Sequence, residues 1–201
     1  MSICITGGAG FVGSTLARRY RALYPERRIV AIDNLKRRGA EFNLADFKAQ
    51  DIEFEHGDVR IAGDLEAITG DFDLLIDASA EPSAHAGADG SPDYLIDTNL
   101  GGTLNCLEWA RRRGTALLFL STSRVYSLPA LRQLPLVEEE TRLSLDAAKT
   151  LPRGLSATGI DETFDTSRHR SLYGATKLAS ELFVQEYCAT YDLKAIINRC
   201  S

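Results

Sequence analysis

The sequence has few cysteines, no long apolar run and no excess of basic residues, and each absence excludes a class of protein. The four cysteines are scattered without a CxxC pair, so we expect no metal site and no disulfide framework. The longest aliphatic stretch, residues 116–120, is far shorter than the roughly 18 residues that predict a membrane span, so no membrane partner is expected. Lysine and arginine number 23 against 28 aspartates and glutamates, and this acidic balance argues against a nucleic-acid partner.

What the sequence does contain is typical of a globular protein. Its 201 residues are enough for one large domain, and the composition of 44% hydrophobic and 25% charged residues excludes a disordered or fibrous chain. The first residues lead directly into glycines, with neither the basic nor the apolar segment of a signal peptide. We therefore expect a cytoplasmic protein whose cysteines are reduced and packed as small hydrophobic residues.

Short apolar runs recur along the chain, and each ends in a polar residue or glycine. They are residues 3–6, 29–33, 52–58, 72–77, 116–121 and 193–198. Most of them are separated by stretches with helical period, such as residues 12–24. Alternating strands and helices, with strands apolar on both faces, predict an α/β fold in which a parallel sheet is covered by helices on both faces.

Two long stretches, residues 94–113 and 172–191, have the period of helices. The first ends in three arginines and Gly114, which predicts a solvated helix end; a ligand site is the alternative. In the second, apolar side chains share one face, which we expect to contact the sheet and also a partner subunit. These side chains are Ala175, Leu178, Ala179, Leu182 and Phe183.

Residues 127–170 fit neither pattern. They contain prolines, glycines and a run of three glutamates at 138–140, without a regular apolar period. A connection of this length inside a compact domain is normally functional or disordered. Two interpretations stay open, a wall or lid that faces the substrate and a mobile insertion.

A glycine-rich loop, GGAGFVG at residues 7–13, directly follows the first predicted strand and opens the first helix. Glycine suits this place because the turn is tight, a pyrophosphate must approach the backbone amides, and helix and strand pack closely. Asp33 ends the second predicted strand, twenty residues beyond Gly13, where a carboxylate binds ribose hydroxyls and repels a 2′-phosphate. The pattern predicts a dinucleotide site that prefers NAD to NADP, although the basic residues 36–38 could attract a phosphate.

Tyr173 and Lys177 form a YxxxK pair, one helical turn apart on the same face. A nearby ammonium lowers the pKa of a tyrosine and makes it a usable general base. The pair alone is a weak signal, because such residues are usually just surface side chains. Residues 121–123, Ser-Thr-Ser, end the fifth predicted strand at the edge where such folds bind ligands, and a hydroxyl there can hold the substrate oxygen. A simple strand-end turn is the alternative.

Six motifs in order carry a resemblance to a known family. They are GGAGFVG at 7–13, Asp33, HGDVR at 56–60, DTNLGGT at 97–103, STSRVY at 121–126 and YGATK at 173–177. Their order is similar to that of the extended short-chain dehydrogenases/reductases, the NAD-dependent nucleotide-sugar epimerase/dehydratase family, over essentially the whole chain. The resemblance implies a Rossmann-type doubly wound parallel sheet, NAD as cofactor, a nucleotide-sugar substrate and a homodimer formed through the two long helices.

The resemblance also implies a role for each matching residue. The pyrophosphate is held by Gly7, Gly10, Phe11, Val12 and Gly13. The adenosine ribose is held by Asp33 and Asn34, and the adenine by Asp58 and Val59. The nicotinamide side is lined by Ala78, Ala80 and Glu81, with Asn99 beneath the cofactor. The catalytic residues are Thr122, Tyr173 as the base, and Lys177, which with Tyr173 also contacts the cofactor.

Within the family, residues 33–44 and 121–126 and the long insertion are most similar to the CDP-paratose 2-epimerases. This similarity implies C2 epimerisation of a CDP-deoxyhexose through a transient keto sugar. Ser123 and Arg124 stand where dehydratases carry Asp-Glu, which counts against dehydration, and Asp77 and Glu81 replace the usual His and Gln. The alternatives are another nucleotide-sugar oxidoreductase, a 4-epimerase or a reductase, and a catalytically inactive NAD-binding protein.

Members of the family continue beyond the last predicted strand into a substrate-binding domain, whereas this sequence ends at Ser201. We therefore expect residues 1–201 to form an NAD-binding domain with a long insertion at about 127–170. The substrate-binding domain is expected to be absent or truncated.

Overall fold

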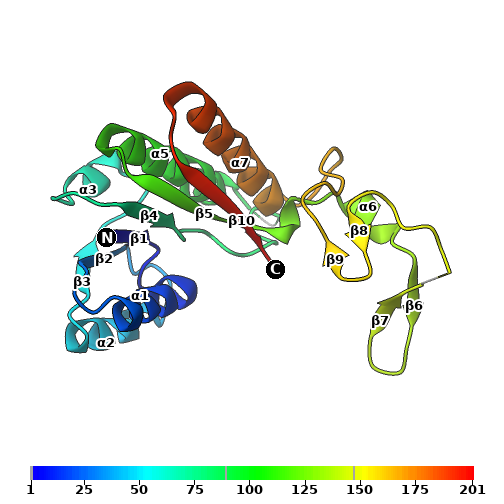
Figure 1. Ribbon diagram of the computed structural model, residues 1–201, viewed down its shortest axis with the longest axis horizontal. Coiled ribbons are helices and arrows are strands. Elements are labelled where there is room, and N and C mark those ends of the chain that lie inside the picture. The colour runs from blue at the N-terminus through cyan, green and yellow to red at the C-terminus, as the bar shows by residue number, and fades with distance from the viewer. Residues whose placement is uncertain (1, 89, 147) are drawn as a thin grey trace.

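The computed structural model describes residues 2–88, 90–146 and 148–201, and a six-stranded parallel sheet forms the core of this part of the chain (Figure 1). The strands are β1 (Ile3–Thr6), β2 (Ile29–Asp33), β3 (Glu53–His56), β4 (Leu74–Asp77), β5 (Ala116–Thr122) and β10 (Ala195–Cys200). They lie in the order β10-β5-β4-β1-β2-β3, so the direction of winding reverses between β1 and β4. This order confirms the predicted Rossmann-type doubly wound α/β fold.

Helices cover both faces of the sheet. They are α1 (Phe11–Leu23), α2 (Asn43–Ala49) after a short turn η1 (Ala40–Phe42), α3 (Ala62–Glu66), α5 (Gly102–Arg113) and α7 (Leu172–Tyr191). Ala17 of α1 shares a core cluster with Ile5, whereas Val184 of α7 shares another with Cys4. Because successive strand residues point to opposite faces, Cys4 and Ile5 anchor helices on opposite sides of the same strand.

The two edge strands are more exposed than predicted, because the sequence pattern predicted strands that are apolar and covered on both faces. The predicted run at 52–58 forms a strand only over Glu53–His56, and Phe54 is its one residue that is not exposed. In β10, Ile196 is 66% exposed. An edge strand has a neighbour on one side only, so its residues alternate between buried and exposed more than those of the central strands do.

The predicted helix over 94–113 is divided in the structure. A short helix, α4 (Asp93–Ile96), leads through a π-helical turn, η2 (Asp97–Gly101), into α5. Such turns often occur at functional sites. At the far end, Arg111 pairs with Glu108 at 2.8 Å and Arg112 with Glu66 at 3.3 Å, so these arginines contact carboxylates of the protein itself; a solvated helix end stays a prediction.

Helix α7 turns a different face to the sheet from the one its apolar pattern predicts. Leu182 and Phe183 are 56% and 42% exposed, whereas the polar residues Ser180 and Glu181 are buried. The Ser180 hydroxyl donates to the Asn99 carbonyl at 3.0 Å, and Glu181 accepts from a serine of β5. These hydrogen bonds offset the cost of burying polar groups, so the prediction that the apolar stripe contacts the sheet is wrong for Leu182 and Phe183.

Residues 127–146 and 148–170 form an arm that projects beyond the sheet (Figure 1). The arm contains α6 (Leu128–Arg132) and two small hairpins, β6 (Leu136–Glu138) with β7 (Leu143–Leu145) and β8 (Leu155–Ser156) with β9 (Gly159–Ile160). At its base Tyr126 packs edge-on against Phe164, with ring centroids 5.6 Å apart. Over the described residues, the long insertion therefore consists of short regular elements joined by turns and irregular segments.

Helices of the kind that cross a bilayer, both long and apolar, do not occur over the described residues. In the same part of the chain, no three His, Cys, Asp or Glu side chains gather in a way that could hold a metal ion. The four cysteines carry free thiols, and Cys4 and Cys106 lie in the core.

Candidate cofactor and active site

The glycine loop joins β1 to α1 at the edge where the winding reverses. Gly7 adopts a positive φ of 61°, and a Cβ there would lie 2.8 Å from the Ala78 carbonyl oxygen. A Cβ on Gly13 would collide with the carbonyl of Gly7. Both positions therefore require glycine, one for the turn and both for the close contact of loop, helix and neighbouring strand.

Helix α1 begins at this loop without a capping side chain, because its N-cap residue is Gly10. The amides of the first turn, from Phe11 to Gly13, have no partners within the helix, and the positive end of the helix dipole adds to them. The side chain of Phe11 is 87% exposed, so its predicted role depends on its amide. A helix start of this kind fits the pyrophosphate that the glycine loop is predicted to hold.

Asp33 ties the end of β2 to the glycine loop. Its carboxylate accepts hydrogen bonds from the amides of Ala9 at 3.1 Å and Leu35 at 2.8 Å. A carboxylate has about four acceptor positions, so Asp33 keeps capacity for ribose hydroxyls. Lys36 and Arg37 line the same cleft. These basic side chains therefore lie where they could attract a phosphate, which is the alternative that the sequence left open.

Asp58 lies behind the cleft wall rather than in it. The residue is 8% exposed, and its carboxylate accepts from Asn34 at 2.9 Å and pairs with Arg60 at 2.6 Å. The Arg60 guanidinium holds the pKa of Asp58 well below its usual range. Its neighbours Gly57 and Val59 line the cleft. Val59 therefore lies where it can contact the adenine, as predicted, whereas Asp58 holds the loops together.

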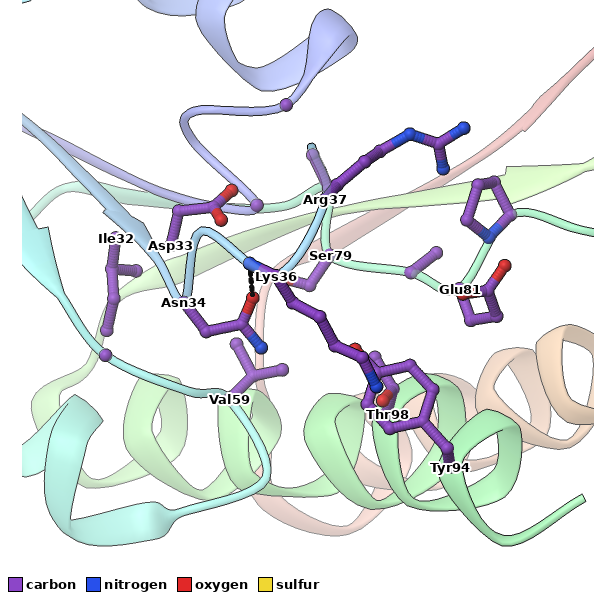
Figure 2. Close-up of a pocket in the computed structure, with 16 residues that line it drawn as sticks. Ile32, Asp33, Asn34, Lys36, Arg37, Val59, Ser79, Glu81, Tyr94 and Thr98 are labelled. Carbon is purple, nitrogen blue, oxygen red and sulfur yellow. Dashed lines mark hydrogen bonds between the residues drawn. The ribbon is translucent and has the colours of Figure 1, made fainter. Parts of the chain in front are cut away.

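These elements enclose a cleft of about 220 Å³ at the carboxyl edge of the sheet (Figure 2). The predicted cofactor residues on its wall are Gly7, Gly10, Asp33, Asn34, Val59, Ala78, Ala80 and Glu81. Ligands of open α/β sheets bind at the point where the strand order reverses, and this cleft lies there. The sequence motifs therefore predicted eight of the sixteen residues on the wall.

Thr98 lines the cleft and was not predicted. It is 6% exposed, and its hydroxyl is one of the buried polar groups that have no hydrogen-bond partner in the described part of the chain. The predicted residue beside it, Asn99, is fully buried and instead holds the backbone of Glu81 through two hydrogen bonds, at 2.8 and 3.2 Å. The sequence could not distinguish the two, because the π-helical turn decides which side chain faces the cleft.

A second cleft, of about 860 Å³, joins the first. The two share Ala78, Ala80 and Pro82 in their walls. The second cleft contains the three predicted catalytic residues, Thr122, Tyr173 and Lys177. From the arm it is lined by Leu131, Gly159 and Ile160, so the insertion forms one of its walls.

Several backbone contacts hold Tyr173 at the start of α7. The Ser171 hydroxyl caps the helix by accepting from the Gly174 amide at 3.1 Å, and Gly174 packs directly against the Arg124 carbonyl. Thr122 and Tyr173 line the second cleft together, and the Thr122 hydroxyl accepts from the Arg124 amide at 3.2 Å. The strand-end hydroxyl and Tyr173 thus lie in the same cleft.

The expected lowering of the pKa of Tyr173 by Lys177 is not found. Burial raises the pKa of Tyr173, while the neighbouring Thr122 hydroxyl and the positive charge of Arg124 oppose this rise. Lys177 is itself 2% exposed, and its ammonium lies 4.0 Å from the centroid of the Phe119 ring. Burial lowers the pKa of Lys177, against the attraction of Asp77 and Glu181, so desolvation outweighs the neighbouring charges at both residues.

Glu181 and Arg199 form an ion pair beside the second cleft, and neither was predicted. The carboxylate of Glu181, which is 1% exposed, meets the Arg199 guanidinium at 2.7 Å. Arg199 also donates to the Glu162 carbonyl of the arm at 3.2 Å. The sequence did contain a signal for Glu181: it follows Lys177 by one helical turn, so the two side chains must lie on the same face of the helix.

A doubly wound sheet with a dinucleotide cleft that opens into a Thr-Tyr-Lys cleft is the arrangement of an NAD-dependent enzyme of the short-chain dehydrogenase/reductase class. The chain belongs to the NAD dependent epimerase/dehydratase family, whose model matches residues 3–201. The NAD dependence of this family confirms the predicted cofactor. The glycine cradle, the open first turn of α1 and the buried Thr98 hydroxyl all fit such a group.

Relatives and solved structures place the chain among sugar epimerases and dehydratases. It is 31% identical to CDP-paratose 2-epimerase of Salmonella typhi, with 100% of this chain and 57% of that protein covered. It is 27% identical to dTDP-glucose 4,6-dehydratase of Mycobacterium tuberculosis (strain ATCC 25618 / H37Rv), with 100% and 53% covered. The chain therefore spans about half the length of the curated relatives it matches.

Solved structures agree with this placement. The crystal structure of dTDP-glucose 4,6-dehydratase from Bacillus anthracis str. Ames in complex with NAD has a TM-score of 0.71 and 25% identity, covering 100% of this chain and 55% of that one. A UDP-galactose 4-epimerase has a TM-score of 0.68 and 27% identity, covering 99% and 55%.

Proposed function

We propose that the chain is the cofactor-binding part of an NAD-dependent nucleotide-sugar epimerase, which inverts C2 of a CDP-linked deoxyhexose through a transient keto sugar. The observation that carries the proposal is the shared wall of the two clefts, Ala78, Ala80 and Pro82. A dinucleotide in the first cleft and a sugar in the second would meet at this wall. The 31% identity to a CDP-paratose 2-epimerase over the whole chain supports the choice of substrate.

NAD, when bound, supplies the acceptor for a hydride and returns it to the sugar. The protein side chains supply the proton transfer and the orientation. Thr122 holds the sugar hydroxyl beside Tyr173, with which it lines the second cleft, and Tyr173 takes the proton from that hydroxyl. Lys177, buried beneath them, binds the cofactor beside Tyr173.

The residues of the second cleft favour epimerisation over dehydration. Elimination of water needs a general acid and a general base near the leaving hydroxyl. No aspartate or glutamate is among the described residues that line this cleft, and Ser123 and Arg124 occupy the place of the Asp-Glu pair. Dehydratases nevertheless match at similar identity, so the choice of epimerisation in our proposal rests on the residues of the cleft and not on the identity.

A 4-epimerase or a reductase is the second candidate, supported by the similarity to a UDP-galactose 4-epimerase. An inactive NAD-binding protein would not need Thr122 and Tyr173 in the same cleft. We further propose that the protein is cytoplasmic and forms a homodimer through α5 and α7, where Leu182 and Phe183 are exposed.

The test uses this chain and any longer protein that contains it. NAD-loaded protein is mixed with CDP-, dTDP- and UDP-sugars, and proton NMR follows the configuration at C2 and C4. We expect inversion at C2 of a CDP-sugar in the longer protein, and its loss in Tyr173→Phe with NAD still bound. Inversion at C4 alone, formation of a dehydrated sugar, or unchanged turnover in Tyr173→Phe would contradict the proposal.

A further inference from the structure

Lys36 and Tyr94 meet at the rim of the NAD cleft. Lys36 lies in the loop after β2 and Tyr94 in α4, and both line the cleft. The Lys36 ammonium lies 3.0 Å from the centroid of the Tyr94 ring. In Figure 2 the Lys36 side chain extends from its loop to the face of that ring. A cation over an aromatic face is an attractive contact.

Tyr94 receives a second cation from another loop. The guanidinium carbon of Arg60, which follows β3, lies 4.8 Å from the centroid of the same ring. Arg60 is held by the 2.6 Å ion pair with Asp58, and Asp58 accepts from Asn34 at 2.9 Å. These contacts form a closed ring. It runs from Asn34 through Asp58 and Arg60 to Tyr94. From Tyr94 it returns through Lys36 to the loop after β2 that also holds Asn34.

This ring of contacts joins three segments that frame the end of the cleft where Asp33 lies. A cofactor whose adenosine occupies that end must separate them, or move past them, to leave. We propose that Lys36 and Tyr94 form a rim bridge that slows the release of NAD by closing the adenosine end of the cleft. The inference rests on the proposed function only in requiring that the cleft bind NAD.

The size of the effect follows from the exposure of the two cations. Both Lys36 and Arg60 are exposed to solvent, where a cation–π contact changes an equilibrium about two- to fivefold. Loss of the ring removes both contacts, so release is expected to become about tenfold faster. Loss of Lys36 alone removes one contact and gives a smaller acceleration.

The experiment measures release of NADH from this chain by stopped-flow fluorescence after mixing with excess NAD. Tyr94→Leu is expected to release NADH about tenfold faster than the parent, and Lys36→Met about threefold faster. Tyr94→Phe keeps the ring and is expected to restore slow release. Tyr24→Leu, the same change at a tyrosine that is 46% exposed and outside both clefts, is the matched control.

The double variant Lys36→Met/Tyr94→Leu separates a bridge from two independent effects. If the two side chains act together, it releases NADH no faster than Tyr94→Leu. Multiplied effects, parent-like release in Tyr94→Leu, or fast release in Tyr94→Phe would overturn the proposal. Failure of the parent to bind NADH would overturn the proposed function as well, whereas binding with unchanged release rates would overturn the bridge alone. Lys36 is exposed, so Lys36→Met tests the proposal even where Tyr94→Leu fails to fold.

Discussion

Glu181 on α7 and Arg199 on β10 form a two-point ion pair in which the carboxylate is almost completely removed from solvent. The arginine side chain is 16% exposed, and the Ser121 hydroxyl also donates to Glu181. Removing one partner of a buried pair leaves an uncompensated charge, which costs about 3–5 kcal/mol. The pair thus fixes α7, and with it Tyr173 and Lys177, against the last strand of the sheet.

We predict that Arg199→Met lowers the free energy of unfolding by about 3 kcal/mol, measured by urea denaturation. Glu181→Gln/Arg199→Met, which removes both charges, should recover part of this loss. Arg142→Met, at an exposed pair with Glu139, is the control and should change stability by less than about 1 kcal/mol. Equal stability of Arg199→Met and the parent would show that the pair is not needed.

Arg124 is expected to set the working pH of Tyr173. Its positive charge opposes the rise in the pKa of Tyr173 that burial causes. The base is the tyrosinate, so activity increases as pH rises through this pKa. In Arg124→Met the pKa of Tyr173 should rise further, and the acid limb of the pH–rate profile should move to higher pH. Arg124→Lys should keep most of the parent profile; a profile unchanged in Arg124→Met would exclude this role.

Local sequence signals predicted the parts of this molecule that depend on short-range geometry. The glycine loop, Asp33 at the end of β2 and the alternation of strands with helices follow from residues close together in the chain. Longer-range effects decided the rest. The apolar stripe of α7 did not predict its buried face, because Ser180 and Glu181 find hydrogen-bond partners on Asn99, Ser121 and Arg199.

The same limit applies to the two clefts. Spacing placed Tyr173 and Lys177 on one face, but the change in their pKa values depends on burial, which only the packed structure shows. Likewise, the π-helical turn η2 turns Thr98 toward the cleft and Asn99 away from it, and no simple period predicts such a turn.

Asp33 is expected to determine the preference for NAD. Its carboxylate would repel a 2′-phosphate, while Lys36 and Arg37 on the same cleft wall would attract one. We predict that Asp33→Asn weakens NAD binding about tenfold, through loss of charge-assisted hydrogen bonds, and strengthens NADP binding relative to NAD. Isothermal titration calorimetry of both cofactors gives the ratio. Asp46→Asn, at an exposed carboxylate outside the cleft, is the control; an unchanged ratio in Asp33→Asn would assign the preference elsewhere.

The exposed apolar side chains of α7 lead to a prediction about assembly. Leu182 and Phe183 lie on the side of the helix away from the sheet, with 56% and 42% of their surfaces exposed. Covering such a surface with a second copy would remove apolar area from water, which is worth about 25 cal/mol for each Å². In a symmetric dimer each substitution is present in both copies, so Phe183→Lys places two charges in the interface and should give a monomer.

Light scattering coupled to size-exclusion chromatography measures this outcome. We expect the parent chain to elute with the mass of a dimer and Phe183→Lys with that of a monomer. Leu136→Lys, at an apolar residue of the arm that is 42% exposed, makes the same change outside α7 and should leave the dimer intact. A parent chain that stays monomeric at high concentration, or a Phe183→Lys variant that stays dimeric, would exclude α7 as the interface.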